Sequence, residues 1–321
     1  MSKHLVYSPR YDIRLLGIER LHPFDSRKYS RAFNLLRGRL GPALDQWVTA
    51  PLAAMDEQQL LQVHLPYYLR RLRKPGCVAR ALELPPLRFF PAFVLERAAL
   101  RPMRWACAGT LLAGQLALDN GFAVNFAGGY HHAKPGGGEG FCIYSDIALL
   151  IHELRRSGHL PSYGIVAYVD LDVHQGNGVC HCFLDERNVI ILDAFNRWIY
   201  PAHDTLARQR VNYPIPLDEG CDDGLYLELL RTHLPRFFDL VACTKAPALV
   251  IYNAGTDILR GDPLGRLAVS EQGVLERDQF VVQQARQREL PVVMLLGGGY
   301  TEASHTVIAS SVEALLGQFA S

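Results

Sequence analysis

Short runs of apolar residues, rich in valine, isoleucine and leucine, recur along the chain from residue 122 onward. They do not alternate with polar residues, as expected for strands of a parallel sheet that is covered on both faces. Loop-forming residues bound the runs. We therefore predict buried strands at residues 122–126, 165–169, 189–192, 248–252 and 291–296.

Segments with helical character lie between these strands. We predict helices at residues 147–156, 226–238 and 272–288. Ser145 and Asp146 are candidate caps for the first, which should end near Gly158, and Pro235 can interrupt the second near its end. The alternation of strands and helices predicts an α/β fold with a central, mainly parallel sheet flanked by helices.

The first ~100 residues have a more helical and irregular character. Pro85, Pro86 and Pro91 predict an extended loop there. The glycine-rich stretches later in the chain directly follow predicted strands, so they are interpreted as loops and not as linkers. Without a linker or an internal repeat, residues 1–321 are predicted to form a single domain.

The composition is that of an ordinary globular protein. Hydrophobic residues make up 49% and charged residues 20%, which excludes disordered, collagen-like and coiled-coil classes. The formal net charge of +1 gives no overall attraction to nucleic acid or to an anionic membrane. We therefore expect no direct nucleic-acid partner.

The cysteines and the apolar runs predict a reducing compartment and no membrane span. Seven cysteines, odd in number and scattered, fit a reducing environment better than a disulfide framework. The first residues include no apolar signal-peptide stretch, and no later run approaches the roughly 20 apolar residues of a membrane span. We expect a cytoplasmic protein without a membrane span, and the oligomeric state is left open.

Polar residues follow the predicted strands at the points where the strands end. In an open α/β sheet the loops at these carboxyl ends converge on one crevice, where ligands bind. The polar and glycine residues found there are His131, His132, Asp170, Asp172, His174, Asn177, Asp193, Asn253, Asp257, Gly298 and Tyr300. We therefore predict a functional site at this edge of the sheet.

Asp172 and His174 have the spacing of a metal-binding pair, because residues i and i+2 of an extended chain point to the same side. A single Asp-x-His is more often a turn cap beside a histidine bonded to backbone. Here Asp257 offers a third ligand from another strand end. Two oxygens and one nitrogen, with a position left open for water, make the donor set of a catalytic zinc, which polarises a carbonyl and lowers the pKa of bound water to about 7.

Further side chains could take part in hydrolysis. His131 or His132 could take a proton from the water and return it to a leaving amine. Asp170 and Asn177 could orient the two rings. Tyr300, which follows three glycines, could donate a hydrogen bond to the developing oxyanion. These roles predict a zinc-dependent hydrolase that removes acyl groups from amines.

Two other motifs are weaker candidates. Cys180 and Cys182 flank His181, but no second pair of matching spacing accompanies them, so buried thiols are favoured over a second zinc site. The glycines at 136–140 and 297–299 lack the Lys-Ser/Thr ending of a phosphate loop, which disfavours nucleotide binding.

Together these motifs resemble the zinc-dependent histone deacetylase superfamily, which shares its fold with arginases. The resemblance extends over nearly the whole chain. It rests on HPFD at 22–25, the histidines 131–132, GFC at 140–142, DLDVHQGNG at 170–178, YNAGTD at 252–257 and GDP at 261–263. The NAGTD form, Gln175, Asn177 and NRWIYP at 196–201 look most like the class IV branch.

The resemblance implies a catalytic role for each strand-end residue. It implies zinc ligands at Asp172, His174 and Asp257, a general base and acid at His132 assisted by His131, and a tetrahedral intermediate stabilised by Tyr300. Substrate contacts are implied at Gly140, Phe141 and Gly298. Phe141 would wall an acyl-lysine tunnel, and the opposite wall falls within residues 196–200 without a fixed register.

The resemblance also implies a second ion and a product pocket. A potassium ion would lie beside the zinc, held by Asp170 and by Asp193, which stands where a serine often contributes. Lys28 would lie near the pocket from which product leaves. Asn177 stands where class I members carry an aspartate, and the acidic residue that clamps substrate backbone in class I has no clear match within residues 84–91.

The predicted activity is that of a protein lysine deacylase. The class IV resemblance implies that long fatty-acyl chains are favoured over acetyl, and the glycines at 136–138 could leave room for a wider pocket. An acylpolyamine amidohydrolase and a catalytically silent module that binds acyl-lysine remain as alternatives. An arginase-like enzyme is disfavoured, because the residues after Asp257 lack the second aspartate that would bridge two metal ions.

Overall fold

An eight-stranded sheet forms the centre of the computed structural model, which describes residues 2–15, 17, 23, 25 and 27–320. The strands run in the order β2-β1-β3-β8-β7-β4-β5-β6, and each pairing is parallel. Their bounds are β1 Leu5–Val6, β2 Val48–Thr49, β3 Phe122–Asn125, β4 Val166–Asp170, β5 Val189–Asn196, β6 Tyr213–Leu217, β7 Leu249–Asn253 and β8 Val292–Leu295. Parallel strands place all their carboxyl ends at one edge of the sheet.

The five strands predicted from apolar runs are confirmed. Four agree with the prediction to within one residue at each end, and β5 continues four residues further, to Asn196. The prediction missed β1 and β2, which are only two residues long, and β6 at the outer edge. β6 contains Pro214 and Pro216, which lack a backbone N–H and are tolerated at an edge.

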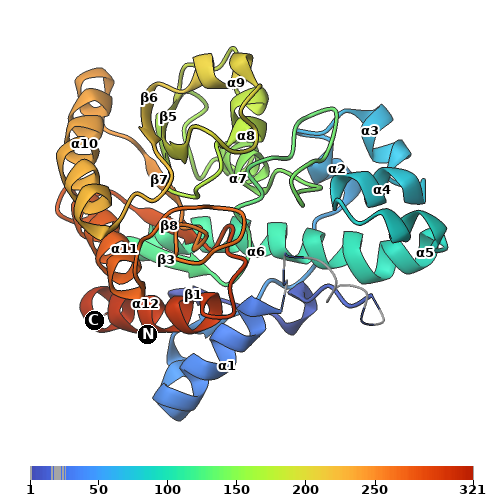
Figure 1. Ribbon diagram of the computed structural model, residues 1–321, viewed down its shortest axis with the longest axis horizontal. Coiled ribbons are helices and arrows are strands. Elements are labelled where there is room, and N and C mark those ends of the chain that lie inside the picture. The colour runs from blue at the N-terminus through green and yellow to red at the C-terminus, as the bar shows by residue number, and fades with distance from the viewer. Residues whose placement is uncertain (1, 16, 18–22, 24, 26, 321) are drawn as a thin grey trace.

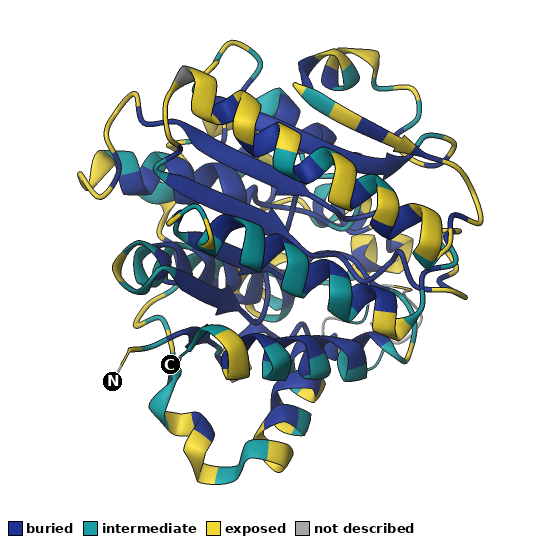
Figure 2. Ribbon diagram, turned by 90° about the vertical axis from the view of Figure 1, so that its left-hand side faces the viewer, coloured by how far each residue is buried: buried dark blue, intermediate teal, exposed yellow. Residues whose placement is uncertain are grey.

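Helices cover both faces of the sheet (Figure 1), and Figure 2 shows buried strands between helices with exposed outer sides. One core cluster contains residues of α1 Lys28–Leu40, α10 Asp223–Thr244, α11 Glu271–Arg286 and α12 Ser304–Phe319. The other draws mainly on α7 Asp146–Arg156, α8 Asn177–Cys182 and α9 Thr205–Arg210, and α6 Arg101–Asn120 contributes to both. In the described part of the chain, no helix combines the length and apolar character needed to cross a bilayer.

The central strands place apolar side chains in both clusters. In β4, Ala167 and Val169 belong to the cluster on one face, and Val166 and Tyr168 to the cluster on the other. All four are fully buried. This explains why the apolar runs show no alternation with polar residues, and it confirms the predicted covered parallel sheet.

Short helices lie between β2 and α6 at one end of the molecule, on the right of Figure 1. Their bounds are α2 Glu57–Leu60, α3 Pro66–Arg71, α4 Pro75–Ala81, the 3-10 helix η4 Pro85–Phe89, α5 Ala92–Leu95 and the π-helix η5 Glu96–Leu100; two more 3-10 helices are η1 Pro9–Tyr11 and η3 Gly41–Gln46. The predicted extended loop is wrong. Pro85 and Pro86 begin η4, and Pro91 precedes α5, because proline fixes φ near its helical value at a helix start.

The predicted helices are confirmed, but their local details differ. α7 begins at Asp146 and ends at Arg156, with Ser157 as its C-cap just before Gly158, whose φ is +78°. The Ser145 side chain makes no capping hydrogen bond, and the Asp146 carboxylate points inward, where it accepts from two backbone amides of the β3–α7 loop. α10 continues through Pro235 to its end without the expected interruption.

Candidate metal centre

Asp172, His174 and Asp257 meet at the carboxyl edge of the sheet. The first two follow β4, and Asp257 follows the neighbouring strand β7. One ligand atom from each lies within 4.8 Å of the others, and all three side chains are buried. Within the described ranges, these three form the group of His, Cys, Asp and Glu side chains that could hold a metal ion. The structure thus brings the predicted ligands together.

Backbone amides hold the two carboxylates in place. Gly298 N donates to Asp172 Oδ2 at 2.6 Å, and Val173 N donates to Asp257 Oδ1 at 3.0 Å. The remaining oxygens, Asp172 Oδ1 and Asp257 Oδ2, lie 3.2 and 3.1 Å from His174 Nδ1. Asp172 Oδ1 also accepts from His174 N at 3.0 Å, so backbone amides fix both oxygens of Asp172 and one oxygen of Asp257, while one oxygen of each carboxylate converges with the imidazole nitrogen.

This donor set fits a zinc ion. Burial and the neighbouring charge of Asp172 raise the pKa of Asp257 to about 7, so the two carboxylates repel each other and a shared cation would relieve the repulsion. Gly298 permits the close approach: a Cβ there would lie 2.1 Å from Asp257 Oδ2 and 2.6 Å from Asp172 Oδ2. Two carboxylate oxygens and one imidazole nitrogen are the ligand types of a catalytic zinc.

His131 lies beside the ligands and is backed by a carboxylate. Its Nδ1 is 2.8 Å from Asp170 Oδ2, and its Nε2 is 3.6 Å from Asp172 Oδ1. Burial opposes protonation of His131, but the charges of Asp170 and Asp172 outweigh it and raise the pKa to about 9. His131 is therefore a positively charged ring at neutral pH.

His132 has the opposite character, although its ring centroid is only 4.1 Å from that of His131. Its Nδ1 lies 2.8 Å from the amide oxygen of Asn177. Burial, followed by the positive charge of His131, lowers the pKa of His132 well below its ordinary value. His132 is therefore a neutral ring that can accept a proton, and the two histidines are suited to different tasks.

A cavity of about 520 Å³ opens next to this centre. Its lining consists of Pro23, Glu83, His132, Gly140, Phe141, His174, Trp198, Ile199, Tyr200, Pro263, Leu264, Arg266 and Tyr300. The Tyr200 ring lies edge-on to His132, with ring centroids 5.0 Å apart, and Phe141 lies edge-on to Tyr300 at 5.9 Å. Tyr200 is thus an aromatic wall residue within the segment whose register the sequence left open.

Tyr300 is half-buried and is positioned through its backbone. Its N–H donates to Asp262 Oδ2 at 2.8 Å, while Asp262 Oδ1 accepts from the amides of Leu264 and Gly265 at 3.0 Å each. The Lys28 ammonium is buried and donates to the carbonyl oxygens of Gly297 at 2.8 Å and Gly299 at 3.2 Å. The GDP motif at 261–263 therefore serves to hold the loop that presents Tyr300.

The remaining predicted site residues lie around the same centre. Gly140 and Phe141 line the cavity with φ of +53° and +66°, and a Cβ on Gly140 would meet His132 Cδ2 at 2.4 Å. Gly298 lines a small space of about 20 Å³ that shares His132, Gly140, Phe141 and Tyr300 with the cavity. Asp193 is buried in β5, where it accepts from Gly176 N at 2.9 Å, and burial together with Asp170 raises its pKa.

Part of the HPFD motif lies outside the described residues, namely His22 and Phe24. Pro23 lines the cavity, and Asp25 accepts from Arg27 N at 2.9 Å and pairs with Arg31. The motif therefore contributes one residue to the cavity wall within the part that the structure describes.

The Cys-His-Cys motif lies outside the metal centre. Cys180 is buried in the core, and Cys182 is half-buried. His181 Nε2 lies 2.9 Å from Asp204 Oδ2, so its ring is engaged by a carboxylate. In the described part of the chain, none of these three belongs to a group that could hold a metal ion.

Sequence reasoning missed several residues that support the site. Arg277 of α11 is fully buried and donates to backbone carbonyls of both ligand loops. Lys134, Glu139 and Asp204 connect to His132 through Asn177. No local signal marks these residues, because an arginine in an amphipathic helix and charged residues in loops ordinarily face solvent.

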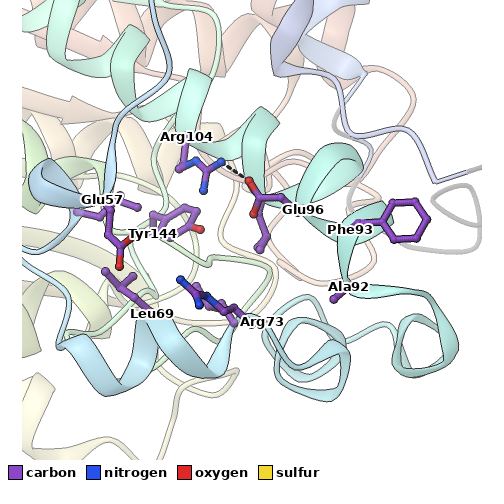
Figure 3. A pocket seen from close by; sticks show the side chains of 11 residues that line it. Glu57, Leu69, Arg73, Ala92, Phe93, Glu96, Arg104 and Tyr144 are labelled. Carbon is purple, nitrogen blue, oxygen red and sulfur yellow. Dashed lines mark hydrogen bonds and ion pairs between the residues drawn. The ribbon is translucent and has the colours of Figure 1, made fainter.

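A second hollow, of about 460 Å³, lies among the short helices and is shown in Figure 3. Glu96 and Arg104 form an ion pair there, and Tyr144 and Leu69 are further lining residues. It shares no described lining residue with the cavity at the metal centre. The chemical groups singled out from the sequence therefore gather around the first cavity.

The parallel sheet carries Asp172, His174 and Asp257 at its carboxyl edge, beside a histidine pair, and this is the arrangement of a hydrolase of the histone deacetylase type. The family model described as the histone deacetylase domain matches residues 22–317, and the chain belongs to this family. Histone deacetylase 2 of Arabidopsis thaliana is 41% identical over 315 residues, covering 97% of this chain and 78% of that protein.

Other relatives agree with this assignment. An uncharacterized protein of Picosynechococcus sp. is 34% identical, covering 96% of this chain and 95% of that protein. Histone deacetylase 1 of Homo sapiens is 33% identical over 189 residues, covering 56% of this chain and 36% of that protein. The crystal structure of the HDA15 HD domain has the same fold, with a TM-score of 0.75, 20% identity and coverage of 98% of this chain and 91% of that chain.

Proposed function

We propose that this chain is a zinc-dependent lysine deacylase of the class IV branch, which hydrolyses the amide of an acylated lysine on a protein or peptide. The observation that carries the proposal is the buried group of Asp172, His174 and Asp257 beside a cavity lined by His132 and Tyr300. Family membership supports the hydrolase class. On the basis of the sequence, we also propose that the protein is cytoplasmic and that residues 1–321 form one catalytic domain.

The side chains around the cavity provide the proton transfers. Zinc, when held by the three ligands, polarises the amide carbonyl and makes water acidic enough to attack at neutral pH. His132 accepts the proton of the attacking water at Nε2, because its Nδ1 is engaged with Asn177, and then returns it to the leaving lysine amine. His131, kept charged by Asp170, and the Tyr300 hydroxyl stabilise the negative charge that develops on the carbonyl oxygen.

The cavity is proposed to receive the acyl-lysine arm, with Phe141 and Tyr200 among its walls. Gly136, Gly137 and Gly138 are not among the described residues that line it, so the sequence-based reason for a wider pocket does not hold. Support for long acyl chains comes from the class IV motifs, which include Asn177 and residues 196–201.

A potassium ion is proposed next to the zinc, at Asp170 and Asp193. Both carboxylates are fully buried, and Asp193 Oδ1 accepts no hydrogen bond from the described part of the chain. Oxygen donors and uncompensated buried negative charge suit such a cation. Thermal unfolding in potassium and in choline chloride should show stabilisation by potassium, and Asp193→Asn should remove that difference.

The central test compares turnover by the wild type with that of Tyr300→Phe and His132→Ala on an acetyl-lysine peptide. We expect kcat to fall by about 10²–10⁴-fold in each variant, while the zinc content, measured by atomic emission, stays at one ion per chain. Unchanged activity in either variant would contradict the assigned roles. Wild-type protein that binds acyl-lysine peptide without turnover would instead indicate a silent binding module.

A second assay decides the substrate. Acetyl-, octanoyl- and myristoyl-lysine peptides and acetylspermidine would be compared by kcat/KM, with and without chelator. A higher kcat/KM for myristoyl than for acetyl supports the fatty-acyl proposal, and fastest turnover of acetyl excludes it. Preference for acetylspermidine over every peptide would favour the acylpolyamine alternative.

A further inference from the structure

A connected group of polar side chains lies on the Nδ1 side of His132. This support network consists of Lys134, Glu139, Asn177 and Asp204. Asn177 Nδ2 donates to Glu139 Oε1 at 2.6 Å and to Asp204 Oδ2 at 3.1 Å. Lys134 Nζ lies 2.9 Å and 3.1 Å from the same two oxygens. The amide and the ammonium therefore share two carboxylate oxygens.

The network connects the buried centre to the protein surface. Asn177, the first residue of α8, is fully buried, whereas the Glu139 side chain is 36% exposed and the Asp204 side chain 16%. Asp204 is fixed as the N-cap of α9 through Ala207 N and accepts from His181 Nε2 at 2.9 Å. Although burial opposes it, these bonds and those from Lys134 and Asn177 hold the pKa of Asp204 well below its usual range. The carboxylate is therefore charged at neutral pH.

The two carboxylates determine which way the Asn177 amide points. An ionised carboxylate only accepts hydrogen bonds, so the NH₂ group of Asn177 must face Glu139 and Asp204. The amide oxygen is then the atom that faces His132 Nδ1 at 2.8 Å, and this oxygen can only accept. The proton of the neutral His132 ring must therefore reside on Nδ1, which leaves the Nε2 lone pair available.

We propose that Glu139 and Asp204, held together by Lys134, are positioning residues that select the Nδ1-protonated tautomer of His132 by orienting the amide of Asn177. The inference rests on the proposed function, in which His132 Nε2 takes the proton of the attacking water. Without the two carboxylates, the amide could turn over and present its NH₂ group to His132. The ring would then carry its proton on Nε2 and could not act as a base there.

Glu139 restrains His132 along a second route. Burial, together with the charge of Glu139, raises the pKa of the Tyr200 hydroxyl, and the Tyr200 ring lies edge-on to His132 with centroids 5.0 Å apart. One carboxylate thus lies near both the amide of Asn177, which faces His132 Nδ1, and Tyr200, whose ring packs against His132. A loop residue beside the cavity wall therefore influences the base without contacting substrate.

Charge in the network also explains why an amide suits position 177. An aspartate there would put a third carboxylate next to Glu139 and Asp204. Lys134 already pairs with both of these carboxylates. Like charges within hydrogen-bonding distance are strongly unfavourable in a partly buried site. Asn177→Asp should therefore be harmful in the natural background and tolerated when Glu139 and Asp204 are neutral.

The tautomer can be read without any substrate. Zinc-loaded protein labelled with ¹⁵N-histidine would be compared with Glu139→Gln/Asp204→Asn by NMR, with His132→Ala used to assign the His132 nitrogens. We expect wild-type His132 to carry its proton on Nδ1. The double variant should show a fraction of His132 protonated on Nε2, because the introduced Gln and Asn side chains can donate as well as accept and so can bond to either orientation of the Asn177 amide. An Nε2 proton in the wild type, or an unchanged Nδ1 proton in the double variant, would overturn the proposal.

Kinetics provide the second readout. Glu139→Gln/Asp204→Asn should lower kcat on acetyl-lysine peptide by about tenfold or more, with KM little changed, as for other residues that orient a site from behind. Asn177→Asp alone should lower kcat by at least about tenfold. The same change added to the double variant should leave kcat near that of the double variant. Equal losses from Asn177→Asp in both backgrounds would contradict the charge argument.

A matched control separates this effect from general loss of acidic groups. Asp239→Asn/Glu276→Gln removes two carboxylates from exposed ion pairs with Arg288 and Arg231, and should leave kcat and the His132 signals unchanged. Thermal unfolding and zinc content of every variant would confirm that each is folded and loaded. Wild-type protein with the Nδ1 tautomer but no deacylase activity would reject the proposed function and leave the tautomer control in place.

Discussion

The guanidinium of Arg277 donates a hydrogen bond to the carbonyl oxygen of Gly255 at 2.6 Å, two residues before the ligand Asp257. The same nitrogen donates to Leu171 O at 3.3 Å, one residue before the ligand Asp172. One fully buried cation of α11 thus ties the loops after β4 and β7 to each other. Helix α11, which packs on one face of the sheet, therefore links the two loops that carry the proposed metal ligands Asp172 and Asp257.

Arg277→Met should destabilise the protein by about 3–5 kcal/mol, because it leaves the buried carbonyls without this donor and the buried Asp278 carboxylate without its cation. Urea unfolding of the zinc-loaded protein would measure this. Arg231→Met, which breaks the exposed pair with Glu276, is the matched control and should cost less than about 1 kcal/mol. Comparable losses from the two variants would show that Arg277 has no special role.

Gly298→Ala should abolish metal binding. The added Cβ would lie within 2.6 Å of one carboxylate oxygen of Asp172 and one of Asp257. The backbone cannot move the Cβ away without breaking the hydrogen bond that Gly298 N donates to Asp172. Gly137→Ala is the control, since a Cβ there meets nothing within 4 Å. Zinc titration monitored by calorimetry should show binding for the control and none for Gly298→Ala; normal affinity in Gly298→Ala would disprove the predicted clash.

Removal of the metal should destabilise the fold as well as stop turnover. Chelation leaves Asp172 and Asp257 with unrelieved repulsion, and a ligand that binds only the folded state stabilises it by about 4 kcal/mol at a thousandfold excess over Kd. We expect a lower unfolding temperature in chelator, reversed by Zn²⁺ but not by Mg²⁺. Asp257→Asn should respond much less to chelator, and an equal response would place the metal elsewhere.

The protein should lose stability in mild acid, because the buried side chain of His64 resists protonation. It is buried, with Nδ1 3.2 Å from Lys134 O and Nε2 accepting from Ser145 N at 3.1 Å, and burial lowers its pKa to about 4. In the unfolded chain a histidine has a pKa of about 6.5, so between pH ~6.5 and ~4 the unfolded chain binds a proton that the folded chain does not. The stability that neutral His64 contributes is therefore fully present above pH ~6.5 and is lost as the pH falls toward ~4.

The measurement compares the wild type with His64→Gln by urea unfolding at pH 7.5 and 5.0. The advantage of the wild type should shrink by about 2 kcal/mol at the lower pH, which corresponds to 1.5 pKa units. His159→Gln changes an exposed histidine and should show no such trend. An equal difference between wild type and His64→Gln at both pH values would show that His64 titrates normally in the folded protein.

The strands, and the convergence of the three candidate metal ligands, could be predicted because their signals are local. A buried parallel strand is a short apolar run, and Asp172, His174 and Asp257 directly follow such runs. Parallel topology then brings the strand ends together without further information. Proline-containing β6 and the two-residue strands escaped because their sequences have no such pattern, and the prolines at 85–91 start helices that only tertiary packing stabilises.

The supporting residues could not be predicted because their meaning depends on contacts between distant segments. Glu139 and Asp204 are 65 positions apart, yet both accept from the Asn177 amide. Nothing near Arg277 in the sequence shows that its side chain lies under the ligand loops. Asp146, expected to cap a helix, instead binds the amides of Gly129 and Tyr130, since the fold places that loop within reach.

The position of β8 in the sheet has a consequence for the synthesis of this protein. β8 is the last described strand in the chain, but it lies between β3 and β7, and these two strands meet only through it in the described hydrogen-bond order. Before residues 292–295 are synthesised, β3 and β7 have no described strand between them to pair with. The two parts of the sheet can therefore join only after β8 has left the ribosome, and until then the facing edges of β3 and β7 would be open to aggregation or to chaperones.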